Sequence, residues 1–144
     1  MSPLPSPTSP LLALRAAILT YLALDATLAR LMGGTVRLTD EPPRGAAPVY
    51  ALFGDAEIRD DPVDGARRHR HAFSLTVFAK PGSLRSAVDA AERIADLLSD
   101  APLALSGHAL VRLDCQALAV RRDPASGEAR ATLTLAAITE RLPA

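Results

Sequence analysis

The sequence has few large or reactive side chains. Only 3% of its 144 residues are aromatic, tryptophan is absent, and Cys115 is the single cysteine. A lone cysteine excludes an internal disulfide, so a reducing cytoplasm or an assembled particle is a more natural setting than secretion. Because large rings are scarce, we expect a core of alanine, leucine and valine. Such a domain gains from further apolar burial against a partner, at roughly 25 cal/mol per Å².

The sequence also lacks a charge excess and a membrane-spanning segment. Sixteen basic and sixteen acidic residues cancel, so we expect no overall attraction to nucleic acid and no membrane partner. The apolar run at residues 11–24 is too short to cross a bilayer. The proline-rich residues 1–10 lack the basic start of a signal peptide. With 49% hydrophobic residues, the chain predicts a flexible lead-in at residues 1–9 and one domain at 10–144.

Two segments carry apolar residues at helical spacing. The first, residues 10–24, has an apolar stripe that Leu12 and Leu19 are expected to widen. The second, residues 84–98, has one apolar face and one face of arginine and acidic residues. Asp25 is a typical N-cap, so we expect a short helix directly after it.

Four segments alternate between apolar and polar residues, as strands with one buried face do. They are residues 49–59, 70–79, 109–121 and 129–140. Residues 36–39 are a candidate for a further short strand. Two hairpins separated by a helix predict an α+β fold, with an antiparallel sheet of about four strands and two main helices packed on one face. Cys115 is expected to be buried in this sheet.

The polar clusters do not form a recognised catalytic or metal site. His69 and His71 share a strand face, but they lie in an arginine-rich run and no third ligand completes a set, so we expect surface or interface histidines. Ser106, His108 and Asp114 lack the local signature of a nucleophilic site. We therefore expect no enzymatic activity, no cofactor and no metal.

The segment between the first two predicted strands has opposite charges in its two halves. The acidic half holds Asp60, Asp61 and Asp64, and the basic half holds Arg67, Arg68 and Arg70. The acidic residues do not have the spacing of a calcium loop. Pro62 and Gly65 argue against a helix and against a tight two-residue hairpin. We expect a loop that is mobile in the free subunit and ordered by charge pairing with an adjacent subunit, and the alternative is a solvent-exposed connection.

The order and spacing of several segments resemble the tail-completion, or tail-terminator, proteins of long-tailed phages and phage-like gene transfer agents. The segments that carry the resemblance are LRAAILTYLALDATLARLMGGTV, APVYALFG, HAFSLTVFAKPG, SAVDAAERIADLL and GHALVRLDCQALAVRRDPASGEARATLTLAAITE. Together they span roughly residues 12–140, which is most of the chain. Their order along the chain is more specific than any one of them alone.

The resemblance implies a structural protein that forms a ring, commonly a homohexamer, at the head-proximal end of a tail tube. The ring would end tube growth and join the tail to the head-side connector. Its partners would be copies of itself, the major tail tube protein and the connector or stopper, with DNA passing through the lumen without sequence-specific binding. Such a protein would assemble in the bacterial cytoplasm and end in the neck of the particle. The family has no catalytic residues.

Two other functions stay open from the sequence. A head-side neck protein, such as a stopper, would bind the portal-side adaptor instead of the tube protein. A small cytoplasmic enzyme or ligand-binding domain would need a deep pocket that encloses His108 and Asp114.

Overall fold

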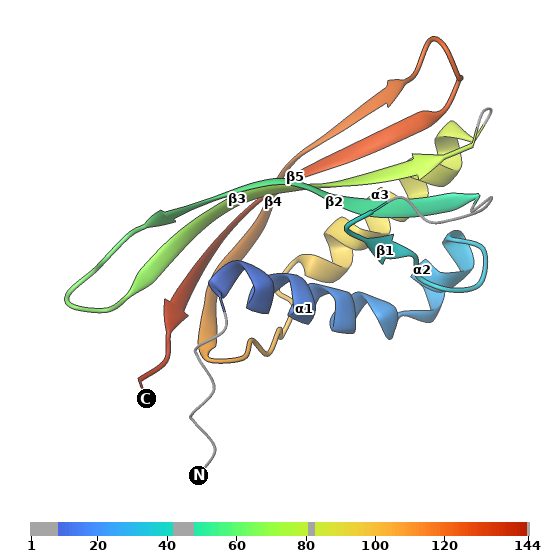
Figure 1. The fold of residues 1–144 in the computed structure, drawn as a ribbon. Helices are drawn as coiled ribbons and strands as arrows, with labels where there is room; N and C mark the ends of the chain where they lie inside the picture. The colour runs from blue at the N-terminus through green and yellow to red at the C-terminus, as the bar shows by residue number, and fades with distance from the viewer. Residues whose placement is uncertain (1–8, 42–47, 81–82, 144) are drawn as a thin grey trace.

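The computed structural model describes residues 9–41, 48–80 and 83–143 (Figure 1). Its elements, in chain order, are α1 (Pro10–Ala23), α2 (Ala26–Leu31), β1 (Leu38–Thr39), β2 (Val49–Asp60), β3 (Arg68–Ala79), α3 (Leu84–Leu98), β4 (His108–Arg122) and β5 (Ala129–Arg141). The predicted α+β class and the order of elements are confirmed. The predicted lead-in lies outside the described residues except for Ser9.

The sheet has the order β1-β2-β3-β5-β4, and its four long strands are antiparallel as predicted. The prediction of a purely antiparallel sheet was wrong, because β1 runs parallel to β2 and makes the sheet mixed, with five strands in the described part of the chain. Leu38 pairs with Ala51, and Thr39 pairs with Leu52. Two residues are too few to show an alternating pattern, so β1 left little signal in the sequence.

The core lies between the sheet and the helices, and Figure 1 shows α1, α2 and α3 on the same face of the sheet. The fully buried side chains include Leu14, Ile18, Leu22, Leu75, Ile94, Leu133 and Leu135. Where α3 faces the sheet, Ala87, Ala90 and Ala91 are fully buried. Small side chains let the helix backbone approach the strands closely, so alanine and leucine replace large aromatic anchors.

Two predicted core positions on α1 are exposed. Leu12 is 57% exposed and Leu19 is 37% exposed, whereas Ala13 and Ala17 are buried instead. The helix turns one narrow face toward the core, and that face contains alanines at the helical spacing. Alanine contributes little to a hydrophobic pattern, so the leucines determined which face of this helix was predicted to be buried.

The prediction that Cys115 is buried was also wrong, because the residue is exposed. The register of β4 against β5 shifts between Leu110 and Arg112 and again between Cys115 and Ala117. Each irregularity inserts a residue that reverses the alternation of faces along the strand. Val111 is therefore out of phase with Leu113 and Cys115. Cys115 itself lies opposite the buried Leu135, on the helix side of the sheet. It is exposed because β4 is the outermost strand.

The connection between β2 and β3 is a tight hairpin, contrary to the prediction. Val63 and Ala66 exchange backbone hydrogen bonds, with N–O distances of 3.4 and 2.9 Å. Asp64 and Gly65 between them have φ angles of 48° and 81°, as a two-residue type I′ turn requires. Pro62 does not prevent this turn, because the backbone bonds next to it are made by Asp61 and by Val63.

Candidate interaction surfaces

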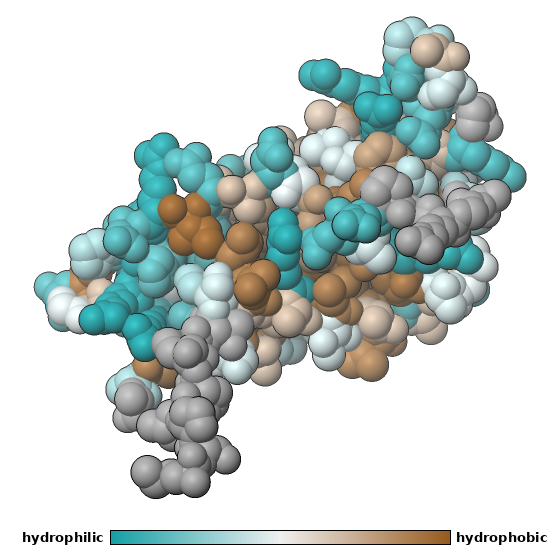
Figure 2. All heavy atoms as spheres, in the orientation of Figure 1, coloured by the Kyte–Doolittle hydropathy of each residue, from teal (hydrophilic) through white to brown (hydrophobic). Residues whose placement is uncertain are grey.

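The β2–β3 arm, residues 57–71, projects beyond the helices at one end of the sheet, and the β4–β5 hairpin projects at the other (Figure 1). Figure 2 shows mainly hydrophilic residues on both projections and hydrophobic residues over the helix layer between them. Long strands that leave the core in this way bury little apolar surface of their own. They present polar side chains that another molecule can contact.

The charges of the β2–β3 arm are largely paired within the subunit. Asp61 Oδ2 lies 2.8 Å from Arg70 Nε, and Asp60 Oδ1 lies 3.3 Å from His69 Nε2. Arg68 Nε lies 3.9 Å from a carboxylate oxygen of Glu140 on β5. Exposed pairs of this kind contribute at most about 1 kcal/mol each. They can therefore exchange partners when another charged surface arrives.

Asp64 and Arg67, the other two residues of the predicted interface, are both exposed near the tip of the arm. The structure thus brings the six predicted charges into one hairpin. It does not separate them into one acidic end and one basic end. The antiparallel pairing sets Asp60 opposite His69 and Arg59 opposite Arg70, so acidic and basic side chains alternate along the hairpin.

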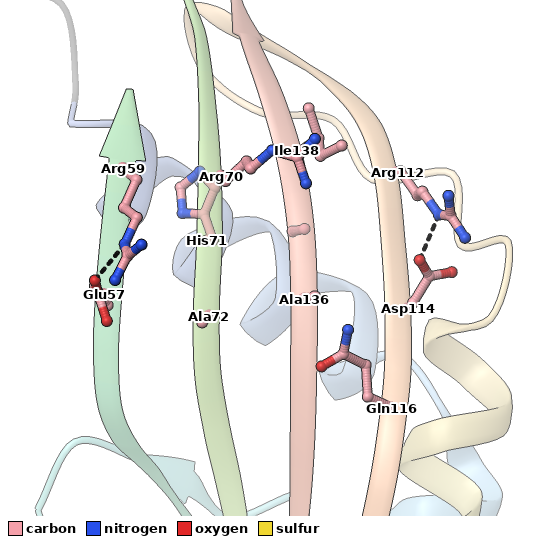
Figure 3. A pocket seen from close by; sticks show the side chains of 11 residues that line it. Glu57, Arg59, Arg70, His71, Ala72, Arg112, Asp114, Gln116, Ala136 and Ile138 are labelled. Carbon is pink, nitrogen blue, oxygen red and sulfur yellow. Dashed lines mark hydrogen bonds and ion pairs between the residues drawn. The ribbon is translucent and has the colours of Figure 1, made fainter. Parts of the chain in front are cut away.

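The sheet face opposite the helices, which we call the open face, carries transverse rows of side chains. Strand register places Arg59, Arg70, Ile138 and Arg112 in one row, and Glu57, Ala72, Ala136 and Asp114 in the next. Figure 3 shows both rows, which lie across β2, β3, β5 and β4. Together they surround a hollow of about 470 Å³ with a floor of small side chains.

The outer arginines of this face are held by carboxylates on their own strands. Arg59 Nε lies 2.6 Å from Glu57 Oε1, and Arg112 forms an ion pair with Asp114 (Figure 3). In each pair the arginine side chain is more than two-thirds exposed. We call Arg59, Arg70 and Arg112 the arginine row. The sequence did not reveal it, because the row depends on the register of four strands.

His71 lies at the base of the β2–β3 arm. Its side chain is on the helix side of β3, opposite the open face. It is 3% exposed, and its Nε2 lies 2.9 Å from Thr139 Oγ1 on β5, which is also buried. The expectation of a surface histidine was therefore wrong for His71. Burial lowers the pKa of His71 to about 4, and the charges of nearby His69 and His108 add to this effect. His71 is thus neutral at pH 7 and bridges two strands.

The three residues considered for nucleophilic chemistry are not brought together. His108 and Asp114 are six positions apart on β4, which corresponds to about 20 Å along a strand. His108 is buried, whereas Asp114 borders the hollow on the open face. Ser106 lines a different hollow, beside α1. Among the described residues, no three metal-ligating side chains lie together either.

The hollow beside α1 has apolar walls. Its volume is about 460 Å³, and it lies between α1 and residues 102–106. Leu12 and Leu24 border it from the helix, and Leu103 borders it from the loop. Leu12 and Leu24 are exposed and Leu103 is partly buried, so this groove is a second candidate contact surface.

No helix in the described ranges combines the length and hydropathy that crossing a membrane requires. Residues 16–140 match the family described as "Tail completion protein gp17". The chain belongs to this family. The expected resemblance is confirmed, and it covers the sheet, both hairpins, α2, α3 and most of α1.

A solved structure supports the same assignment. The chain is similar to a chain of the structure titled "Virion of native gene transfer agent (GTA) particle", with 30% sequence identity and a TM-score of 0.79. The similarity covers 88% of this tail completion protein and 94% of the other chain. No curated protein matches it.

Proposed function

We propose that this tail completion protein is a tail terminator. Copies of it form a ring at the head-proximal end of the tail tube, end tube growth and join the tail to the head-side connector. The observation that carries the proposal is the family match over residues 16–140, and the similarity to a chain from a gene transfer agent virion supports it. Its role is structural rather than enzymatic.

The partners follow from this position in a particle. They are other copies of the chain, as a homohexamer, together with the major tail tube protein and the head-side connector or stopper. DNA passes through the lumen without sequence-specific recognition, consistent with the zero formal net charge of the chain. Assembly takes place in the bacterial cytoplasm, and the finished ring lies in the neck.

The β2–β3 arm supplies one contact between subunits. Asp60, Asp61, Asp64, Arg67, Arg68 and Arg70 exchange their internal partners for charges on the adjacent copy. In each internal pair one partner is largely exposed and the other is half-buried, so water weakens the pair and the exchange costs little. Bidentate arginine–carboxylate pairs at an interface add orientation as well as energy.

The arm is tested by reversing its acidic charges. We expect the triple variant Asp60→Lys, Asp61→Lys and Asp64→Lys to fold but not to assemble, and the triple variant with Asn at the same positions to assemble more weakly than the native chain. Asn tolerates the positive φ at position 64, so the Asn variant separates charge from backbone strain. Normal assembly of the Lys variant would exclude the arm as an interface.

The role of the ring is tested in particles made without the protein. Tubes that lack a terminator should grow beyond their normal length and should not carry heads, as measured by electron microscopy. The mass of the isolated neck gives the number of copies. Cross-linking to the portal-side adaptor without cross-linking to the tube protein would show a stopper instead of a terminator.

A further inference from the structure

The two faces of the molecule carry complementary charges. On the outer side of α3, Asp89, Glu92 and Asp96 recur at helical spacing, whereas Ala87, Ala91 and Ile94 are buried against the sheet. Glu92 and Asp96 are exposed, and the side chain of Asp89 is 44% exposed. We call Asp89, Glu92 and Asp96 the acidic stripe. It lies on the helix layer, on the side of the sheet away from the arginine row.

The stripe and the row also match in size. The three acidic residues span about 10 Å along the helix axis at 1.5 Å per residue. The arginine row crosses from β2 to β4, which is three strand spacings or about 14 Å. Long arginine side chains cover the difference. The floor between the arginines consists of Ala72, Ala136 and Ile138, so a helix can lie close to the strands.

From this complementarity we infer that α3 of one copy docks across the arginine row of the next copy. The inference rests on the proposed ring and names the surfaces that build it. A contact between the helix side of one subunit and the sheet side of another is heterologous, and a heterologous contact closes into a ring when its rotation allows. The two surfaces cannot meet within one subunit, because the sheet separates them. A second copy can bring one surface to the other.

The present pairing of the arginines does not oppose docking. Arg59, Arg70 and Arg112 each contact one carboxylate of their own subunit, and all three arginine side chains remain largely exposed. Arg85, at the start of α3, lies 3.6 Å from Asp89 and is 94% exposed. On docking, Arg85 comes near the carboxylates that border the row.

Two charge-reversal variants test the inference. The sheet variant carries Arg59→Glu and Arg112→Glu, and the helix variant carries Glu92→Arg and Asp96→Arg. Arg70 is left unchanged because it pairs with Asp61 and is one of the six charges of the proposed arm contact. We expect each variant alone to lower the yield of capped particles by more than about tenfold. Because all four positions are on the surface, the unfolding temperature should stay close to that of the native chain.

Co-expression of the two variants is the decisive measurement. Each variant keeps one native surface, so the reversed row meets the reversed stripe and the native row meets the native stripe when the two alternate. We expect capped particles to return to at least half the native yield. As a matched control, Arg30→Glu with Lys80→Glu reverses two exposed cations that belong to neither surface and to neither hairpin projection, and it should assemble normally.

The outcomes separate this inference from the proposed function. If either variant alone assembles like the native chain, or if co-expression does not restore assembly, α3 does not dock on the row. In that case native rings and normal tail lengths would still support the terminator. If the native chain forms no ring and leaves tail length unchanged, the proposed function fails first.

Discussion

The strands β3 and β5 pass through two different environments. In the half covered by helices, Leu75, Val77 and Leu133 are fully buried. Beyond His71 the same strands extend past the helices, and there Arg68 of β3 pairs with Glu140 of β5 across the register. The covered half therefore holds most of the folding free energy, and the projecting half holds most of the surface that another molecule can contact. Changes in the two halves should separate stability from assembly.

The largest effect should come from the covered half. Leu133→Ala removes a fully buried side chain between the sheet and the helices, so we expect a loss of about 2–5 kcal/mol in the free energy of unfolding. Urea titration measures it. The control Val63→Ala, near the arm tip where Val63 is 40% exposed, should change stability by less than about 0.5 kcal/mol. Equal losses of stability at both positions would contradict the statement that the covered half holds most of the folding free energy.

The stability that His71 contributes, at the boundary between the two halves, should depend on pH. The pKa of His71 is lowered to about 4 in the folded chain, below the usual 6.5. Between pH 6.5 and 4 the unfolded chain binds a proton that the folded chain does not, so stability falls as pH falls through this window. The contribution is about 3 kcal/mol, and it is fully present above pH 6.5.

Unfolding in urea at several pH values tests this contribution. His71→Gln keeps a polar group near Thr139 and removes the titration. The variant should be less stable at pH 7 but should lose less stability between pH 6.5 and 4. A variant with the same pH slope as the native chain would show that other groups cause the loss.

A smaller effect is expected within the helix layer. Asp25 Oδ2 accepts the Leu28 N–H at 2.7 Å, and both carboxylate oxygens of Asp25 accept hydrogen bonds from Arg93 on α3. The bonds from Arg93 hold the pKa of Asp25 below its usual value. Asp25→Ala removes the cap and the link between helices, so we expect a loss of about 1–2 kcal/mol. Asp25→Ser keeps a cap and should lose less; equal losses would assign the whole effect to Arg93.

The smallest effect belongs to the tip of the arm. Gly65 has a φ of 81° and open space where a Cβ would lie. Gly65→Ala therefore meets backbone strain without a clash, and we expect a loss of about 1 kcal/mol or less. Thermal unfolding should register this loss, while assembly should weaken only if the turn sets the position of the arm. A loss as large as that of Leu133→Ala would show that the arm is part of the core.

The sequence predicted where the helices and strands lie better than how the strands pair and turn. Helix spacing and strand alternation located the main elements, and the segment order pointed to the right family. The tight turn was missed because Pro62 outweighed Asp64 and Gly65, although an Asp-Gly pair is a strong hairpin signal. The arginine row could not be seen, because a register shift between Phe53 and Ala56 changes which residues of β2 face the open side. Local sequence patterns do not reveal which residues of distant strands lie side by side.

The interruptions of β4 have one further consequence. β4 is the last strand of the sheet, and its outer edge has no partner in the described structure. A long regular edge would be a template for cross-β aggregation. The irregularities after Leu110 and Cys115 divide β4 into shorter regular runs, which makes its outer edge a poorer template for a second chain. The bulges of β4 thus act against edge-to-edge association of free copies of the chain.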